Sequence, residues 1–298
     1  MTDKPLSSDS APGRGRDFTW ILVAYAAALM TAALVVVSLP EFNLWWQVFW
    51  ADLAATVVIF GFSQVFKNSS FYDAYWSVAP PVILLFWQVS LAQWDLRSLM
   101  AMLLVWAWAV RLTHNWARGW QGLGHVDWRY VDLKAKTGPW FLLVDLGGIH
   151  ILPTLWVIFG CLPLWLMLSA GSAPLGGWDL VWPLIGAIAV YFEFRADNVL
   201  RQHRLSGVGG VLDRDLWSLC RHPNYLGELG FWLALAMAGY SATGSSWAWL
   251  GFAGLLILFV GISIPMIERR QVENKPAYAE YQQRTPCLLP WRLSLWRP

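Results

Sequence analysis

Residues 221–236 read RHPNYLGELGFWLALA, a cluster of polar side chains that leads straight into an apolar run. Polar groups at the border of an apolar layer cost free energy unless a partner satisfies them. Pro223 stands where a helix can begin, because its fixed φ suits the first helical turn. Asn224 and Glu228 then lie one turn apart on the same face. The stretch therefore predicts a helix that enters an apolar layer and carries an amide and a carboxylate at its polar end.

The composition of the whole chain is that of a membrane protein. Of the 298 residues, 57% are hydrophobic and only 13% are charged, and the mean hydropathy is +0.44. Soluble domains carry roughly a quarter charged residues. The 23 Trp and 9 Tyr residues suit the interfaces of a bilayer, where amphipathic rings accumulate. The net charge is +2 and no basic run is interleaved with aromatic residues, so the expected partner is a lipid bilayer and not a nucleic acid.

Apolar runs of roughly 20 residues, the length that crosses a bilayer, recur along the chain. We expect an all-α fold, a polytopic integral membrane bundle of about eight transmembrane helices. The predicted spans are 18–39, 45–66, 74–93, 97–117, 140–169, 178–196, 225–240 and 246–267. Residues 1–17 are polar and are predicted to form a disordered cytoplasmic tail, and 18–66 form the N-terminal transmembrane helices.

The charge of the connecting segments predicts the orientation. Segments 40–44, 170–177 and 241–245 contain no Lys or Arg, whereas the alternate connections and both tails are basic. Basic segments mark the cytoplasmic side of a membrane. The alternation indicates an even number of spans with both termini in the cytoplasm. The two richest basic segments, 195–222 and 269–297, would share that side, where an anionic cofactor could enter.

One predicted helix face combines acidic and basic residues. Glu193, Asp197, Arg201 and Arg204 follow one another at intervals of four, four and three, so they lie on one face. The alternative is a set of structural ion pairs on a solvated face. Such a face explains the Arg residues but not a pair of like-charged carboxylates entering the membrane, so the spacing favours a functional role.

Cysteines give no further site. Cys161, Cys220 and Cys287 are scattered and form neither a metal-ligand spacing nor a disulfide framework. No metal is therefore expected.

The stretch 221–228, followed by Tyr278, Tyr281, Arg284, Thr285 and Leu289-Pro290-Trp291, resembles the C-terminal domain of the steroid 5-alpha-reductase superfamily. More narrowly, the chain is similar to a bacterial membrane branch of that superfamily. The resemblance implies that 67–298 forms a steroid-reductase-like membrane catalytic domain. It also implies a bacterial inner (plasma) membrane protein whose active site opens to the cytoplasm. Sterol reductases and isoprenylcysteine carboxyl methyltransferases carry a similar short string.

NADPH is the cofactor that the resemblance implies. An Asp with two Arg residues four and seven positions later matches Asp197, Arg201 and Arg204, and an Asn and a Glu match Asn224 and Glu228. Guanidinium groups bind phosphate through paired donors, which suits a dinucleotide. The predicted cofactor-binding residues are Glu193, Asp197, Arg201, Arg204, Arg221, His222, Asn224, Tyr225, Glu228, Arg270, Tyr281 and Arg284.

For the substrate, the resemblance implies an acidic residue that holds a ketone oxygen and is followed by Pro seven residues later. Asp73 and Pro80 occupy these positions. A Tyr partner is also implied, but the best alignment puts Trp108 there, so Tyr72, Tyr75 and Tyr191 stay open as substitutes. The predicted catalytic residues are Asp73, Tyr75 and Glu228. The loop 119–138, with its Asp-x-Arg-Tyr string, is predicted to be a cytoplasmic flap.

The expected function is NADPH-dependent reduction of a carbon–carbon double bond in a membrane-soluble 3-oxo steroid-like or other lipid enone, with hydride transfer to the β carbon. One alternative is an S-adenosylmethionine-dependent membrane methyltransferase of the isoprenylcysteine type. Those enzymes usually have a Glu-Glu pair where this chain has Glu268-Arg269-Arg270, and the extra cations favour a phosphate-rich cofactor. A second alternative is a non-enzymatic membrane lipid-binding protein.

Overall fold

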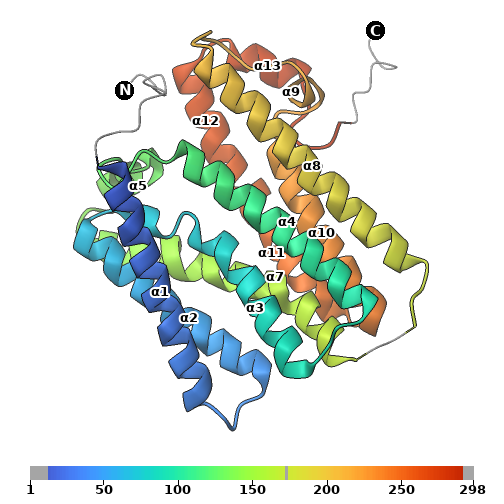
Figure 1. Cartoon of the computed structure of the whole chain (residues 1–298). Coiled ribbons are helices and arrows are strands. Elements are labelled where there is room, and N and C mark those ends of the chain that lie inside the picture. The colour runs from blue at the N-terminus through green and yellow to red at the C-terminus, as the bar shows by residue number, and fades with distance from the viewer. Residues whose placement is uncertain (1–12, 172–173, 291–298) are drawn as a thin grey trace. The chain divides into compact units, whose positions relative to one another are not determined.

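The computed structural model describes residues 13–171 and 174–290. Within these ranges the chain forms helices and loops and no β-strand, which confirms the all-helical fold class (Figure 1). Most of the expected N-terminal tail lies outside the described residues, as does Trp291. The first helix begins at Arg14, so the end of the expected tail is helical.

Six helical segments are long and apolar enough to cross a membrane, and they correspond to the first five expected spans and the eighth. They are Arg14–Ser38, Leu44–Phe66, Ser69–Leu91, Leu96–Gly119, Trp128–Ser169 and Ser246–Asn274. The sixth and seventh expected spans fall in α8 (Trp178–Leu205) and α10 (Pro223–Thr243), whose 28 and 21 residues suffice in length. These two helices differ from the six in apolar character and not in length.

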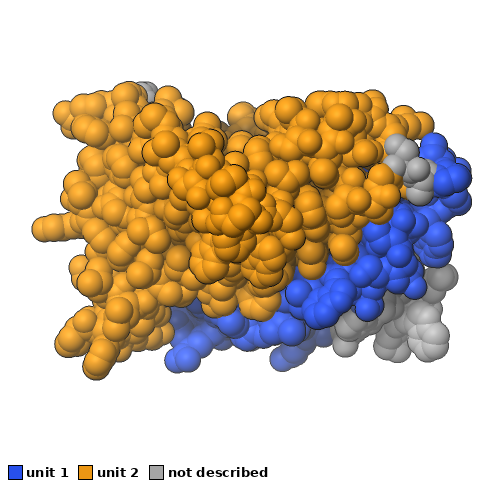
Figure 2. All heavy atoms as spheres, turned by 90° about the horizontal axis from the view of Figure 1, so that it is seen from below, with its two compact units in different colours: residues 1–8, 173–298 blue, residues 9–172 orange. Residues whose placement is uncertain are grey.

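The helices divide into two compact units, shown in different colours in Figure 2: residues 9–172, and residues 173–298 together with 1–8. The first unit holds α1 (Arg14–Ser38), α2 (Leu44–Phe66), η1 (Ser69–Phe71), α3 (Tyr75–Leu91), α4 (Leu96–Gly119), α5 (Trp128–Thr137), η2 (Gly138–Trp140), α6 (Phe141–Val144), η3 (Asp145–Ile151) and α7 (Leu152–Ser169). Here α2 packs against both α1 and α7. The expected boundary between residues 66 and 67 stays a prediction that rests on the family resemblance.

Capping side chains set the start of several helices in the first unit. The Asn43 side chain accepts a hydrogen bond from the Trp46 backbone at 3.1 Å, and Asp95 accepts one from the Ser98 backbone at 2.8 Å. Each bond satisfies a backbone donor that a helix start leaves free. The interior is filled by large aromatic side chains such as Trp87, which is fully buried.

Two segments have π-helical geometry, and each directly precedes a proline. In the first unit η3 runs into α7, whose second residue is Pro153. In the second unit η5 (Phe259–Ser263) runs into α12, whose second residue is Pro265. Proline has no N–H, and its ring clashes with the carbonyl four residues earlier. A wider turn just before the proline relieves that clash, and π-bulges of this kind are frequent at functional sites.

The second unit is built on the close packing of α8 against α10. It also contains α9 (Leu216–Leu219), η4 (Ser246–Trp249), α11 (Leu250–Leu258), η5, α12 (Ile264–Asn274) and α13 (Tyr278–Arg284). Gly227 makes the close approach possible. A Cβ there would lie 2.7 Å from the carbonyl oxygen of Ala189 and 2.4 Å from Cγ of Glu193. The glycine of the 221–228 stretch therefore sets how near the two helices can come.

Gly227→Ala is expected to destabilise the protein, because the backbone of α8 cannot yield to the added methyl group. Overpacking costs about 1–3 kcal/mol, which corresponds to a fall in apparent Tm of roughly 3–10 °C. The measurement is thermal unfolding of the detergent-purified protein. Gly261→Ala is the control, since a Cβ at Gly261 meets nothing within 4 Å. Equal melting of the two variants would show that α8 and α10 do not need the glycine.

Candidate functional site

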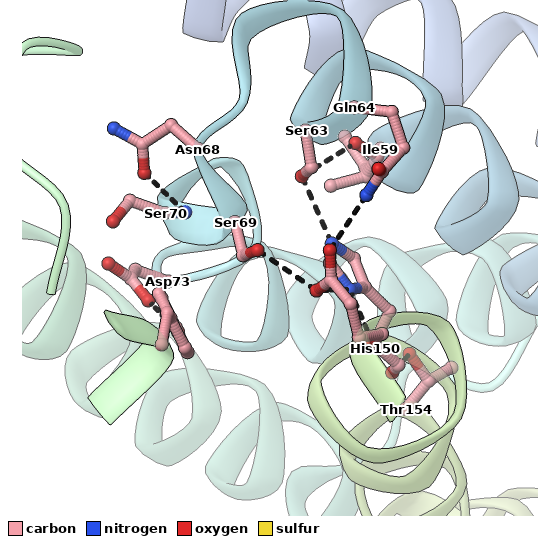
Figure 3. Close-up of polar contacts among 11 residues, drawn as sticks. Ile59, Ser63, Gln64, Asn68, Ser69, Ser70, Asp73, His150 and Thr154 are labelled. Carbon is pink, nitrogen blue, oxygen red and sulfur yellow. Dashed lines mark hydrogen bonds and ion pairs between the residues drawn. The ribbon is translucent and has the colours of Figure 1, made fainter. Parts of the chain in front are cut away.

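A buried polar network lies between the end of α2, η1 and η3 in the first unit. Figure 3 shows Ser63, Gln64, Ser69 and His150 converging on it. At its centre Asp145 accepts hydrogen bonds from Gln64 Nε2 at 2.7 Å and Ser69 Oγ at 2.9 Å, and its Oδ1 lies 3.2 Å from Nδ1 of His150. Asp145 and His150 are 1% and 0% exposed. Buried polar groups require such partners, and here they join three segments.

The contacts of His150 fix which ring nitrogen carries a proton. Nδ1 faces two acceptors of Asp145, the backbone oxygen at 3.0 Å and Oδ1 at 3.2 Å, so Nδ1 donates. Nε2 lies 3.0 Å from Oγ of Ser63. The order of contacts is that of a serine–histidine–acid relay. However, Ser63 is only 1% exposed and its Oγ also lies 3.1 Å from the Ile59 carbonyl. In this conformation the buried serine does not present a nucleophile.

Asp73 lies just beyond η1 and is paired with a tyrosine. In Figure 3 it is seen next to Ser70 and apart from His150. The hydroxyl of Tyr130 donates to Oδ1 of Asp73 at 2.5 Å. Tyr130 belongs to α5, which begins directly after Asp127. The site thus joins a carboxyl group to a phenol from a segment 57 positions later in the chain.

A charged pair stands beside this carboxyl–phenol pair. Arg129 Nε lies 2.9 Å from Asp127 Oδ1, and the Arg129 guanidinium packs over the Tyr130 ring with its carbon 5.6 Å from the centroid. Burial alone would raise the pKa of Asp127, but the hydrogen bonds and charge of Arg129 lower it below its usual value. Asp127 therefore stays ionised and holds Arg129 next to Tyr130.

Tyr130 is the functional candidate that sequence reasoning missed. The candidate tyrosines are placed elsewhere: Tyr75 donates to Asp52 at 2.7 Å, Tyr72 contacts Thr154 at 2.7 Å, and Tyr191 is 61% exposed on α8. The Asp-x-Arg-Tyr string at 127–130 drew attention to the segment but did not indicate the partner of Tyr130. Periodicity could not reveal it, because only the folding of α5 back to η1 brings Tyr130 to Asp73.

In the second unit, the acidic and basic residues predicted to share one face lie on the single helix α8. Glu193 is buried, Asp197 and Arg201 are partly buried and Arg204 is exposed, so the solvent exposure of this face increases toward the C-terminal end of the helix. The buried end of this face abuts α10 at Gly227.

The α10 residues of the predicted site lie in its first two turns. Asn224 is half-buried, and the buried Glu228 accepts a hydrogen bond from Trp232 Nε1 at 2.8 Å. Tyr225 stacks on His222 with centroids 5.6 Å apart and an interplanar angle of 11°. The first two turns of α10 thus carry an amide and a carboxylate on the helix that packs against α8 at Gly227.

Arg221 and His222 instead close a staple on Glu268 of α12. Arg221 Nε donates to Glu268 Oε1 at 2.6 Å, His222 Nε2 lies 3.0 Å from the same oxygen, and Gln282 donates to Oε2 at 3.0 Å. Arg221 also donates to the carbonyls of Gln282 and Thr285 at 2.9 and 2.6 Å. Burial alone would lower the pKa of Arg221, but Glu268 raises it above its usual value. The staple fastens the C-terminal segment to the start of α10.

Three other predicted cofactor residues lie in the C-terminal part. Tyr281 donates to the carbonyl of Trp217, Arg284 pairs with Asp213, and Arg270 is half-buried on α12. Tyr281 and Arg284 thus hold the loop between α8 and α10 against α13. The structure brings Arg221 and His222 together with the C-terminal segment, while Asp197, Arg201 and Arg204 form the α8 face.

One group of side chains has the donor types of a metal site. Atoms of His222, Glu268 and Cys287 lie within 4.8 Å of one another. The Glu268 carboxylate is already neutralised by Arg221 at 2.6 Å, and a guanidinium that close repels a dication. Burial raises the pKa of Cys287, which keeps it a thiol and not the thiolate that metals prefer. The three side chains therefore belong to the staple that joins the start of α10, α12 and the C-terminal segment.

Glu268→Gln is expected to release the C-terminal segment. It leaves the Arg221 charge, whose side chain is 11% exposed, without its carboxylate, and breaking a buried pair costs about 3–5 kcal/mol. Hydrogen exchange of 278–290 should therefore accelerate. Glu273→Gln is the control on the same helix, because its pair with Arg269 is 60–82% exposed and such pairs contribute about 0–1 kcal/mol. Protection of 278–290 that survives Glu268→Gln would contradict the staple.

Comparison with known proteins places the chain in a family. An uncharacterized protein of Schizosaccharomyces pombe is 27% identical over 261 residues, which cover 78% of this chain and 76% of that protein. No solved structure matches the chain. Residues 59–285 match the family described as "Protein of unknown function (DUF1295)", which is linked to the steroid 5-alpha-reductase family. The match spans both the Asp73 site and the 221–228 stretch, and the chain belongs to the DUF1295 family.

Proposed function

We propose that this protein is an NADPH-dependent reductase of a carbon–carbon double bond conjugated to a carbonyl group, in a membrane-soluble 3-oxo steroid-like or other lipid enone. The observation that carries the proposal is the Asp73–Tyr130 pair. A carboxyl group hydrogen-bonded to a phenol in a partly buried setting can donate to a carbonyl oxygen, and this stabilises the negative charge that develops there.

The reaction requires a hydride at the β carbon and a proton at the α carbon. NADPH, when bound, supplies the hydride. Tyr130 and Asp73 would stabilise the enolate oxygen that the hydride transfer creates. The Arg129 guanidinium over the Tyr130 ring adds positive charge beside that oxygen and favours the anionic transition state. A proton from solvent or a side chain then completes the saturated ketone.

The chemistry of the α8 and α10 side chains fits a dinucleotide. Arg201 and Arg204 would pair with phosphate oxygens through forked donors. Asp197, Asn224 and Glu228 offer acceptors and an amide for ribose hydroxyls and a carboxamide. Among the predicted set, Arg221, His222, Tyr281 and Arg284 would shape this site indirectly, since they hold the C-terminal segment and the α8–α10 loop.

We further propose the placement of the protein in the cell. Eight spans, with α8 and α10 as the sixth and seventh, would put both termini and the basic segments in the cytoplasm. The protein would then be a member of the bacterial branch of the steroid 5-alpha-reductase superfamily in the inner membrane. Its site would open to the cytoplasm for NADPH, and a hydrophobic substrate would reach it from the bilayer.

NADPH is expected to raise the apparent Tm of the detergent-purified protein by mass action, by about 5 °C at saturating concentration. Arg204→Ala should abolish this shift. Arg195→Ala is the control, because Arg195 lies on the same helix but pairs with Asp215. NADH and S-adenosylmethionine are tested alongside. A shift with S-adenosylmethionine alone would move the protein to the methyltransferases, and no shift with any of the three would favour lipid binding without catalysis.

Tyr130→Phe and Asp73→Asn are each expected to lower kcat about 10–1,000-fold while the NADPH-induced shift stays intact, because they remove stabilisation of the developing oxyanion. Turnover is followed as loss of NADPH absorbance with a 3-oxo steroid enone in mixed micelles. Tyr191→Phe is the control, since this residue is an exposed tyrosine of α8. Loss of turnover in Tyr191→Phe but not in Tyr130→Phe would overturn the assignment.

A further inference from the structure

We propose that Asn68 is a positioning residue that holds the segment carrying Tyr130 against Asp73. The inference rests on the proposed role of the Asp73–Tyr130 pair, and the contacts of Asn68 are what carry it. Asn68 stands at the junction of α2 and η1, five residues before Asp73. It is therefore part of the turn that places the carboxyl group, and it also reaches the other half of the pair.

The Asn68 side chain has hydrogen bonds both to the turn that precedes Asp73 and to the segment that precedes Tyr130. Its Oδ1 accepts from the Ser70 backbone at 3.0 Å and so caps η1. Its Nδ2 donates to the carbonyl oxygens of Leu123 and His125 at 2.9 and 3.0 Å. The residue is 1% exposed. A fully bonded amide in the interior is costly to disturb, because each abandoned partner would be left unsatisfied.

The segment that Asn68 holds continues into α5, which carries Tyr130. No residue of α5 is buried, and the Tyr130 hydroxyl donates to Asp73. Gly122 and Gly138, with φ of 92° and 52°, flank the segment 123–137 at both ends. Glycines in this region of φ can absorb large changes of backbone angle. The part of the segment that follows the Asn68 contacts, residues 126–137, therefore has the properties of a lid: little buried surface and a glycine of positive φ directly after its end.

Asp17 of α1 also holds the start of this segment. Its Oδ2 accepts from the Leu123 backbone at 2.9 Å and lies 2.8 Å from where a Cβ on Gly122 would be. Asp17 and Asn68 thus hold the segment through different backbone groups. Asp17 accepts from a backbone N–H, and Asn68 donates to two backbone carbonyls. Gly122 is required here both for its φ and for the close carboxylate.

The direct Tyr130–Asp73 bond has a consequence for substrate entry. With the two groups 2.5 Å apart, a third oxygen cannot lie between them. A ketone oxygen can accept from Tyr130 only when the phenol O–H no longer donates to Asp73, and a shift of α5 that moves the phenol away from Asp73 would free it. Asn68 keeps the base of the lid fixed during that movement, so that Tyr130 returns to the same place.

Hydrogen exchange of the purified protein, without cofactor or substrate, tests the proposal. Asn68→Ser keeps an oxygen that can cap η1 but loses both donors to the lid. We expect exchange in 123–137 to accelerate about tenfold or more, with α8 and α10 unchanged. Asn43→Ser is the matched control, since Asn43 also caps a helix through its side chain but makes its contacts away from the lid.

Unchanged exchange in 123–137 would overturn the proposal, and so would a uniform acceleration across the first unit, which indicates general loss of stability. If Asn68→Ser does not fold, Tyr130→Phe gives the answer. Exchange should then rise in 128–137. The backbone N–H groups of Leu123 and His125, bonded to Asp17 and to the Gly122 carbonyl, should stay protected because Asn68 holds the carbonyls of the same residues. Joint opening would mean that Asn68 holds nothing. Failure of the proposed reductase activity would leave these exchange results unaffected, so the two failures are distinguishable.

The kinetic readout separates positioning from stability. Asn68→Ser should lower kcat about tenfold with the NADPH-induced shift intact, because the Tyr130 hydroxyl is less often in place. Asn43→Ser should leave kcat unchanged. Equal kcat in the two variants would contradict the positioning role.

Discussion

The buried carboxylate of Asp145 accepts hydrogen bonds from three different segments. Removing any of these donors from water is costly, and the cost is offset only when all of them meet. Because Gln64 lies in the last turn of α2, Ser69 begins η1 and His150 lies in η3, this one carboxylate fixes where the turn 67–73 must run. The position of Asp73, and through Asn68 that of α5, follows from it.

The second unit uses the same principle with a different carboxylate. Glu268 gathers Arg221, His222 and Gln282, so the start of α10, α12 and the C-terminal segment are joined at one point. In both units a single buried or half-buried acid organises elements that are distant in sequence. The polar residues that make the chain unusual for a membrane protein are thus also the residues that give its apolar helices a unique arrangement.

The sequence predicted what depends on local pattern. The length of the apolar runs predicted the helical class, the first five spans and the eighth. Helical spacing placed Glu193, Asp197, Arg201 and Arg204 on one helix. It could not predict which distant groups meet. Nothing in the string 127–130 says that Tyr130 reaches Asp73, or that Arg221 would turn to Glu268 and not to solvent. The polarity that made α8 and α10 informative is also what sets them apart from the six apolar spans.

The two π segments interrupt long apolar runs and rotate the helix face that follows relative to the face that precedes. Each π turn takes up about one residue more than an α turn, so the face that points inward before the turn is not continued by the 3.6-residue period after it. In 246–267 the hydrophobic pattern therefore describes two consecutive helical stretches, one before and one after η5, whose faces are offset around the axis. Substitutions in the stretch before η5 and in the stretch after it are therefore constrained by different neighbouring side chains, although one continuous backbone joins them.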